Sequence, residues 1–267
     1  MKTVFFLCFV LFVFVSCRKD FADEAVIGYD IILVAGQSNT HYGWGYDSNL
    51  DKTDNRIFQL GRFKEMDYQI IPAAEPLDHH TKKNNRIGFA LTFAKLYANA
   101  FLEVDRVVLI IPCGRAGSGF KNNRWNRGDY YYQDAVERTQ FVLSNFRSSK
   151  LIAVLWQQGE DDVSNMNYQQ DLDQFIGDFR TDLGAVDVPF ILGGMVPFWV
   201  EKNAARVQTQ SIIQTTKNRL SNVGYADPNT PLIISKEADS TDILHYDAAG
   251  LREMGLRYFA SYLELRK

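Results

Sequence analysis

Short apolar runs alternate with amphipathic segments along most of the chain. The runs that predict strands lie near residues 29–35, 55–60, 106–112, 150–156, 189–195 and 231–235. Segments with the apolar period of a helix fall between or after them, at 87–101, 131–147, 167–183, 203–221 and 248–265. Parallel strands need long crossover connections, which are usually helices. The alternation therefore predicts a three-layer α/β/α sandwich with a mostly parallel central sheet.

Length and composition limit the classes of protein to consider. A chain of 267 residues with 46% hydrophobic content can bury one sizeable core, so we expect one main domain. The net charge is -3 and no run of basic residues is present, which argues against a nucleic-acid partner. The sequence has no phosphate-binding glycine loop and no dinucleotide fingerprint, so we expect no nucleotide cofactor.

Residues 1–16 have the pattern of a secretory signal, with a basic start and an apolar run over 4–15. The run is too short to span a bilayer, which takes roughly 20 apolar residues. Cys17 resembles the lipidated cysteine of a bacterial lipobox, and residues 17–27 then form a charged tether before a domain over 28–267. We expect an exported lipoprotein on a cell-envelope membrane. Plain secretion stays open, because Phe14 is unusual three places before the cleavage site.

The cysteines predict neither a disulfide nor a metal site. Cys8 would leave with the signal and Cys17 would carry lipid, so Cys113 would remain alone. Cys113 follows a predicted strand, where we expect a small buried hydrophobe. No cysteine and histidine cluster has the spacing of metal ligands, so we expect no required metal.

A serine follows directly after the first of the apolar runs. The run over 29–35 ends in the tetrapeptide 36–39, which places Ser38 where a buried strand opens into a loop. Such a polar cluster is often only a turn, but it is also where serine hydrolases keep their nucleophile. Far along the chain, Asp242 precedes His245 in a predicted loop. A serine nucleophile needs a base, and the base needs an orienting acid, which His245 and Asp242 would supply.

The chain has four histidines, so a histidine base must be one of them. His79 and His80 lie in a polar stretch, and we expect them in a solvated loop. His41 is close to Ser38 in sequence, and we expect a turn or rim residue there. His245 remains the best candidate for the base, because Asp242 supplies its expected partner.

A third polar segment also follows a strand. The run over 150–156 continues into Gln157, Gln158, Gly159 and Glu160, with Asp162 shortly after. In an open parallel sheet the ligand crevice lies outside the carboxyl ends of the strands. Ser38 and Gln158 are therefore expected to face one cavity.

Together, these segments resemble the sialate O-acetylesterase-like carbohydrate esterases of the SGNH hydrolase superfamily. The matching pieces are the segments 36–39, 156–160 with Asp162, and 242–245 followed by 247–250, in the family's order. The resemblance implies a flavodoxin-like fold, Ser38 as nucleophile, His245 as base and Asp242 as its orienting acid. It also implies a carbohydrate O-acetylesterase that acts through an acetyl-enzyme, with an acetylated glycan as partner and no cofactor.

The resemblance further implies an oxyanion hole made by the Ser38 amide, the Gln158 side chain and a glycine amide. The family usually has Gly-Gly-Thr after its third strand, whereas residues 116–118 here read Ala-Gly-Ser. Gly117 is the expected donor, and Gly114 is the alternative. Thr40 and Gln157 also depart from the residues usual in the family, without removing a member of the proposed triad.

Supporting roles fall to Gln37, Asn39 and Glu160. Glu160 is an acid in the family's signature, so it would either orient His245 or hold the loop that contains Ser38. We expect the structural role, because Asp242 has the better spacing to the histidine.

Two long irregular segments are expected beside the site, over 40–53 and 117–132, and both are rich in aromatic residues. Trp125 and the three tyrosines at 130–132 would either stack on sugar rings or anchor a loop to the core, and we favour the anchor. Two alternatives to the carbohydrate esterase stay open. One is a carboxylesterase of broader specificity, and the other is a lipid-anchored glycan-binding protein without turnover.

Overall fold

The computed structural model describes residues 28–234 and 241–266. The expected signal, Cys17 and the tether at 17–27 lie outside the described residues, as does residue 267. Among the helices that the structure describes, none is long and apolar enough to cross a membrane.

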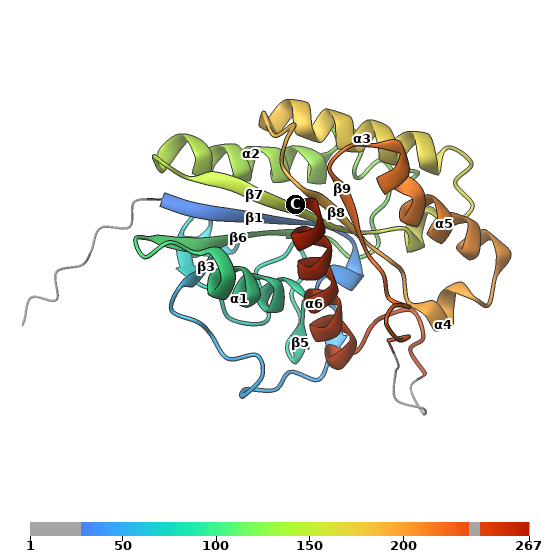
Figure 1. The fold of residues 1–267 in the computed structure, drawn as a ribbon, viewed down its shortest axis with the longest axis horizontal. Coiled ribbons are helices and arrows are strands. Elements are labelled where there is room, and N and C mark those ends of the chain that lie inside the picture. The colour runs from blue at the N-terminus through green and yellow to red at the C-terminus, as the bar shows by residue number, and fades with distance from the viewer. Residues whose placement is uncertain (1–27, 235–240, 267) are drawn as a thin grey trace, which may run out of the picture.

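A seven-stranded sheet forms the centre of the fold (Figure 1). Its strands are β1 (Gly28–Gly36), β3 (Ile57–Leu60), β4 (Ile70–Pro72), β6 (Arg106–Gly114), β7 (Lys150–Gln157), β8 (Phe190–Gly193) and β9 (Val223–Ala226). They lie in the order β4-β3-β6-β1-β7-β8-β9, and every pairing is parallel except that of β3 with the edge strand β4. The short strands β2 (Gly43–Trp44) and β5 (Arg86–Ile87) form a separate antiparallel pair.

Helices cover both faces of this sheet (Figure 1). The helices are α1 (Ala90–Phe101), α2 (Tyr130–Asn145), α3 (Tyr168–Leu183), α4 (Pro197–Val200), α5 (Ala204–Arg219) and α6 (Ala248–Leu265). Three single 3₁₀ turns lie at Ser38–Thr40, Lys64–Met66 and Glu160–Asp162. One face packs against α2, α3 and α5, and the other packs against α1 and α6. The expected three-layer sandwich with a mostly parallel sheet is confirmed.

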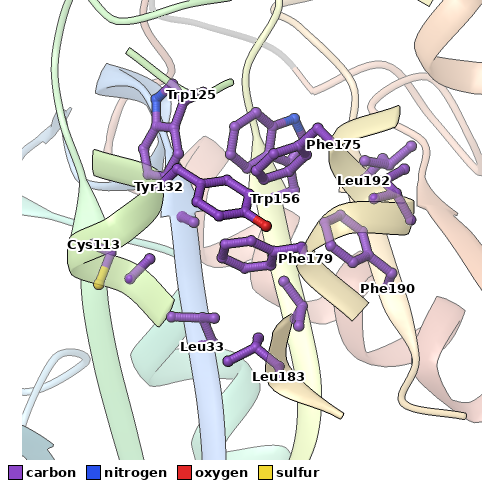
Figure 2. Packing of buried hydrophobic residues seen from close by; sticks show 14 of the residues in the cluster. Leu33, Cys113, Trp125, Tyr132, Trp156, Phe175, Phe179, Leu183, Phe190 and Leu192 are labelled. Carbon is purple, nitrogen blue, oxygen red and sulfur yellow. The ribbon is translucent and has the colours of Figure 1, made fainter. Parts of the chain in front are cut away.

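The core under α2 and α3 is dominated by large aromatic side chains (Figure 2). Trp156 from β7 lies between Phe175 and Trp125, with ring-centroid distances of 4.4 and 5.0 Å. Trp125 and Tyr132 are completely buried, so the loop over 117–129 is fixed to the core. The expected anchoring role is confirmed for these two residues. Tyr130, by contrast, is 66% exposed.

The central strands end together at one edge of the sheet. In β1, Gly36 is in register with Gly114 of β6 and with Gln157 of β7. The three polar segments that follow these strands therefore start side by side. This register brings parts of the chain that are far apart in sequence to one place.

One expected strand does not form in the described residues, and one expected helix begins later than predicted. The expected strand over 231–235 forms no strand at 231–234, and residue 235 lies outside the described residues. Residues 223–226, as β9, already pair with β8 there, and Leu232 and Ile233 are more than half exposed. The expected helix over 87–101 begins only at residue 90, because Ile87 pairs with Gly43 in the small second sheet.

Candidate active site

Ser38 lies in the 3₁₀ turn that follows β1, and its side chain is almost completely buried. The chain turns sharply before it, since Gly36 has a φ of 124°, a conformation that favours glycine. A Cβ at this position would overlap the backbone carbonyl of Gln157 on β7. Glycine therefore allows the start of the serine loop to approach the end of β7, and the Gln37 amide donates to the Gln157 carbonyl at 2.8 Å.

The structure brings Ser38, His245 and Asp242 into one hydrogen-bonded chain. His245 Nε2 lies 3.0 Å from Ser38 Oγ, and His245 Nδ1 lies 2.9 Å from Asp242 Oδ2. The other oxygen of Asp242 accepts from the amides of Leu244 and His245, both at 3.1 Å. This arrangement fixes Nδ1 as the nitrogen that faces the acid and Nε2 as the one that faces the hydroxyl.

Asn39 connects the serine loop to the residues on both sides of His245. Its Nδ2 donates to the Leu244 carbonyl at 3.1 Å, and its Oδ1 accepts from the Tyr246 amide at 3.0 Å. The same nitrogen donates to Glu160 Oε1 at 2.5 Å. Asn39 is completely buried, so these bonds have no competition from water.

Glu160 thus contacts Asn39, the neighbour of Ser38, in keeping with the expected role of holding the serine loop. Burial raises the pKa of this carboxyl from 4.5 to about 7, although the hydrogen bond from Asn39 favours the charged form. The Gln37 side chain makes a second connection, because its oxygen accepts from the amides of Gly159 at 3.4 Å and Asp161 at 3.1 Å.

The Gln158 side chain is completely buried and held by two partners. Its Nε2 donates to Asp162 Oδ2 at 2.7 Å, and its Oε1 accepts from the Tyr168 hydroxyl at 3.1 Å. Asp162 is itself held by the amides of Phe120 and Lys121, at 2.7 and 2.9 Å. A carboxamide nitrogen has two hydrogens, so one donor position of Gln158 is left beside the bond to Asp162.

The two glycines that could donate to the oxyanion differ in whether the backbone amide is already hydrogen-bonded. Gly114 donates to His79 Nδ1 at 2.9 Å, so its amide is already used. Gly117 is exposed, with a left-handed φ of 67°. Within residues 28–234 and 241–266, the amides of Gly117 and Ser38 have no hydrogen-bond partner.

The expectation of a solvated loop for His79 and His80 was wrong. His79 is completely buried, and the His80 side chain is only 8% exposed, with Nε2 3.0 Å from Asp134 Oδ2. His41 is also buried, and its ring stacks on that of His79. The polar residues around 79–85 predict a surface loop, but the Asp78 and His80 amides are hydrogen-bonded to Gln59 of β3 and Gly114 of β6, which places both histidine rings inside the protein. The sequence does not contain these long-range bonds or the one from the Gly114 amide to His79.

Aromatic and basic side chains gather beside His245. The ring centroid of Tyr42 lies 5.2 Å from that of His245. Arg86 lies 5.4 Å from the Tyr42 ring and 4.8 Å from the ring of Trp44, which is 59% exposed. Lys83 lies 5.1 Å from the Tyr42 ring. A partly open, cationic and aromatic surface therefore adjoins the proposed base.

The structure also describes the surroundings of the acidic, histidine and cysteine side chains that could bind a metal ion or act as a thiol. The part of the chain over 28–234 and 241–266 contains no group of three or more His, Cys, Asp or Glu side chains that could hold a metal ion. Cys113 is buried, as expected, and burial raises the pKa of its thiol to about 12. A thiol in this state is not a nucleophile at neutral pH.

The α/β fold, with a mostly parallel sheet between two layers of helices, is that of the SGNH hydrolases. Residues 28–264 match the family of carbohydrate esterases described as sialic acid-specific acetylesterases, and the chain belongs to this family. The resemblance seen in the sequence is confirmed. No match was found among curated protein sequences.

Solved structures show the same fold. The crystal structure of NanS has 22% identity and a TM-score of 0.77, over 91% of this chain and 98% of the other. A protein from Arabidopsis thaliana has 25% identity and a TM-score of 0.73, over 89% and 98%. A structure described as a novel carbohydrate acetylesterase from Xanthomonas citri has 15% identity and a TM-score of 0.59, over 88% of this chain and 56% of that one.

Proposed function

We propose that this protein removes acetyl groups from a carbohydrate, with Ser38 as the nucleophile. The observation that carries the proposal is the hydrogen-bonded chain from Ser38 Oγ through His245 to Asp242, at 3.0 and 2.9 Å. A hydroxyl is a weak nucleophile until a base takes its proton, and here the base lies within hydrogen-bond distance. Membership of a carbohydrate esterase family supports the same reaction class.

The reaction proceeds in two halves. His245 Nε2 takes the proton of Ser38 as the serine oxygen attacks the acetyl carbonyl, and Asp242 stabilises the imidazolium that forms. The tetrahedral intermediate collapses, His245 returns the proton to the sugar oxygen, and the sugar alcohol leaves an acetyl-enzyme. Water then attacks this ester with His245 again as base, and acetate leaves with Ser38 regenerated.

Three donors hold the oxyanion in this proposal: the amides of Ser38 and Gly117 and the Nε2 of Gln158. The amide of Gly114 is not among them, because it already donates to His79. Loss of one such donor typically costs about 2.7–4 kcal/mol of barrier, or roughly 100- to 1000-fold in turnover. We therefore expect Gln158→Ala to lower kcat by roughly 100- to 1000-fold. A kcat within threefold of the wild type would remove Gln158 from the oxyanion site.

The surface beside His245 supports a sugar as the alcohol part of the ester. Tyr42 and the exposed Trp44 offer aromatic faces, on which sugar rings commonly pack. Arg86 and Lys83 lie over the Tyr42 ring, where they would donate to sugar hydroxyl or carboxylate groups.

Acetate release from a panel of acetylated sugars and polysaccharides tests the function, with Ser38→Ala as the control. Release that is absent in the control supports a serine acetylesterase, and the panel identifies the glycan. Faster cleavage of long-chain than of acetyl esters favours the broader carboxylesterase. Binding of an acetylated glycan by folded protein without any acetate release favours the glycan-binding protein.

We also propose that Cys17 carries a lipid anchor that holds the protein at a cell-envelope membrane. The support is the short apolar run over 4–15 that ends at this cysteine. Mass spectrometry of the mature N-terminus tests it, and an unmodified Cys17 or an intact signal contradicts it.

A further inference from the structure

Two buried histidine rings stack on each other close to Ser38. The ring centroids of His41 and His79 lie 4.4 Å apart, with an angle of 13° between the planes. Burial, with His245, His80 and Arg115 nearby, lowers the pKa of His41 to about 3, and burial also lowers that of His79. Both rings are therefore neutral near pH 7, so each has one donor nitrogen and one acceptor nitrogen.

The hydrogen bonds around His41 have only one consistent direction. Thr40 donates its single hydroxyl proton to the Gln37 carbonyl at 2.7 Å, so its oxygen accepts from His41 Nδ1 at 2.5 Å. Neutral His41 then has a bare Nε2, which accepts from the Thr81 hydroxyl at 2.7 Å. The Thr81 oxygen in turn accepts from the Ala116 amide at 3.4 Å. Every donor in this chain has one acceptor, and the chain fixes His41 as the Nδ1–H tautomer.

Both ends of this chain adjoin the amides assigned to the oxyanion. The Gln37 carbonyl belongs to the same peptide unit as the Ser38 N–H, and it also accepts from the Thr40 amide at 3.0 Å. Hydrogen bonds to a carbonyl polarise the N–H of the same unit and make it a stronger donor. At the other end, Ala116 immediately precedes Gly117, so its bond to Thr81 restrains the loop that carries the second amide.

His79 fixes the same region from the neighbouring strand. Its Nδ1 accepts from the amide of Gly114, the last residue of β6. A Cβ at Gly114 would overlap both the Thr40 hydroxyl and the His79 ring. The His79 ring therefore packs where the end of β6 meets the serine loop, and this contact requires glycine.

We propose that Thr40, His41 and Thr81 form a hydrogen-bonded relay that positions the Ser38 and Gly117 amides and polarises the first of them for the oxyanion. They are positioning residues, because they act through these amides and not on the reacting atoms. The proposal rests on the function proposed above. Its physical basis is that oxyanion donors accelerate a reaction only when they are held in place before the charge develops.

Matched threonine variants separate the relay from ordinary packing. Thr81→Val removes the hydroxyl with little change of shape, whereas Thr81→Ser keeps it. Because a weakened donor should cost less than a lost one, we expect Thr81→Val to lower kcat about 10-fold with KM within twofold, and Thr81→Ser to retain most activity. Thr40→Val combined with Thr81→Val should cost little more than either change alone, since both break one chain. Thr215→Val is the control, because the hydrogen bonds that the structure describes for its hydroxyl all lie within the exposed surface of α5.

Two further readouts test the oxyanion directly. Methaneboronic acid forms a tetrahedral adduct with a serine, so its inhibition constant should rise in Thr81→Val by the factor that kcat/KM falls. In NMR spectra of the full chain, His41 should be protonated on Nδ1 and neutral from pH 5 to pH 8. The Ser38 amide proton should move upfield in Thr40→Val.

Any of four results would overturn the relay. The first two are equal kcat values for Thr81→Val and Thr81→Ser, or an effect of Thr81→Val on KM alone. The other two are an unchanged boronate inhibition constant in Thr81→Val, or a wild-type His41 ring protonated on Nε2. If the wild-type protein releases no acetate at all, the proposed function fails. The position of the Ser38 amide resonance in Thr40→Val then decides the relay by itself.

Discussion

Asn39 joins the serine loop to the residues on both sides of His245. Asn39→Ala removes two donated hydrogen bonds and one accepted bond, to Leu244, Glu160 and Tyr246. Each buried polar group left without a partner costs about 1–3 kcal/mol. Even at the low end of that range, the loss of three bonds should lower the free energy of unfolding by about 3 kcal/mol.

The same change should lower turnover. The Leu244 carbonyl and the Tyr246 amide flank His245, so without Asn39 the imidazole is no longer held at 3.0 Å from Ser38 Oγ. A displacement of about 1 Å in a reacting group costs about 100-fold in rate. We therefore expect kcat for acetate release to fall about 100-fold in protein that is still folded.

Urea unfolding and acetate release under the same conditions measure the two effects. Asn145→Ala is the matched control, because among the described residues its side chain bonds only to the Phe141 carbonyl, at the exposed end of α2. A loss of less than 1 kcal/mol, together with turnover within threefold of the wild type, would refute the idea that Asn39 sets the position of His245.

Two further predictions follow from Glu160 and from the glycines. The pKa of Glu160 is raised in the folded state, so the folded protein binds more protons between pH 4.5 and about 7, and its stability falls as pH rises through this window. A shift of this size corresponds to about 3 kcal/mol of unfolding free energy. Glu160→Gln should remove that part of the pH dependence, measured by urea unfolding at pH 5 and pH 8. An unchanged pH dependence contradicts the raised pKa of Glu160. Gly114→Ala should destabilise by more than 3 kcal/mol, because its Cβ overlaps Thr40 and His79, whereas Gly177→Ala on α3 meets open space and should stabilise by about 0.5–1 kcal/mol. Similar thermal midpoints for both glycine variants would show that the region around Gly114 adapts.

The sequence was sufficient for the fold class. Apolar runs of strand length, separated by helical periods, allow few arrangements other than a parallel sheet between two layers of helices. Local patterns were less reliable at the ends of elements. The apolar run at 231–235 looks like a strand, yet β9 at 223–226 takes the edge beside β8. A run of apolar residues shows that a segment can be buried, but the pairing partner decides whether it becomes a strand.

The candidate triad was also accessible from the sequence, because the spacing of Asp242 and His245 is local and Ser38 follows a strand. Their meeting at 3.0 Å depends on the register of β1 with its neighbours, which the sequence does not contain. The burial and the hydrogen bonds of the supporting residues could not be predicted from the sequence. His79 stands in a polar segment, yet it is buried, with its ring bonded to the Gly114 amide and stacked on the ring of His41.

What the sequence alone determined is therefore the periodicity, the order of the motifs and the residue types that can do the chemistry. These are properties of neighbouring residues along one chain. The tertiary structure decided which glycine amide is left for an oxyanion, which acid touches Asn39, and which histidines are neutral and buried. Each of these depends on contacts between segments far apart in sequence, because hydrogen-bond partners and desolvation are set only when the strands and loops pack together.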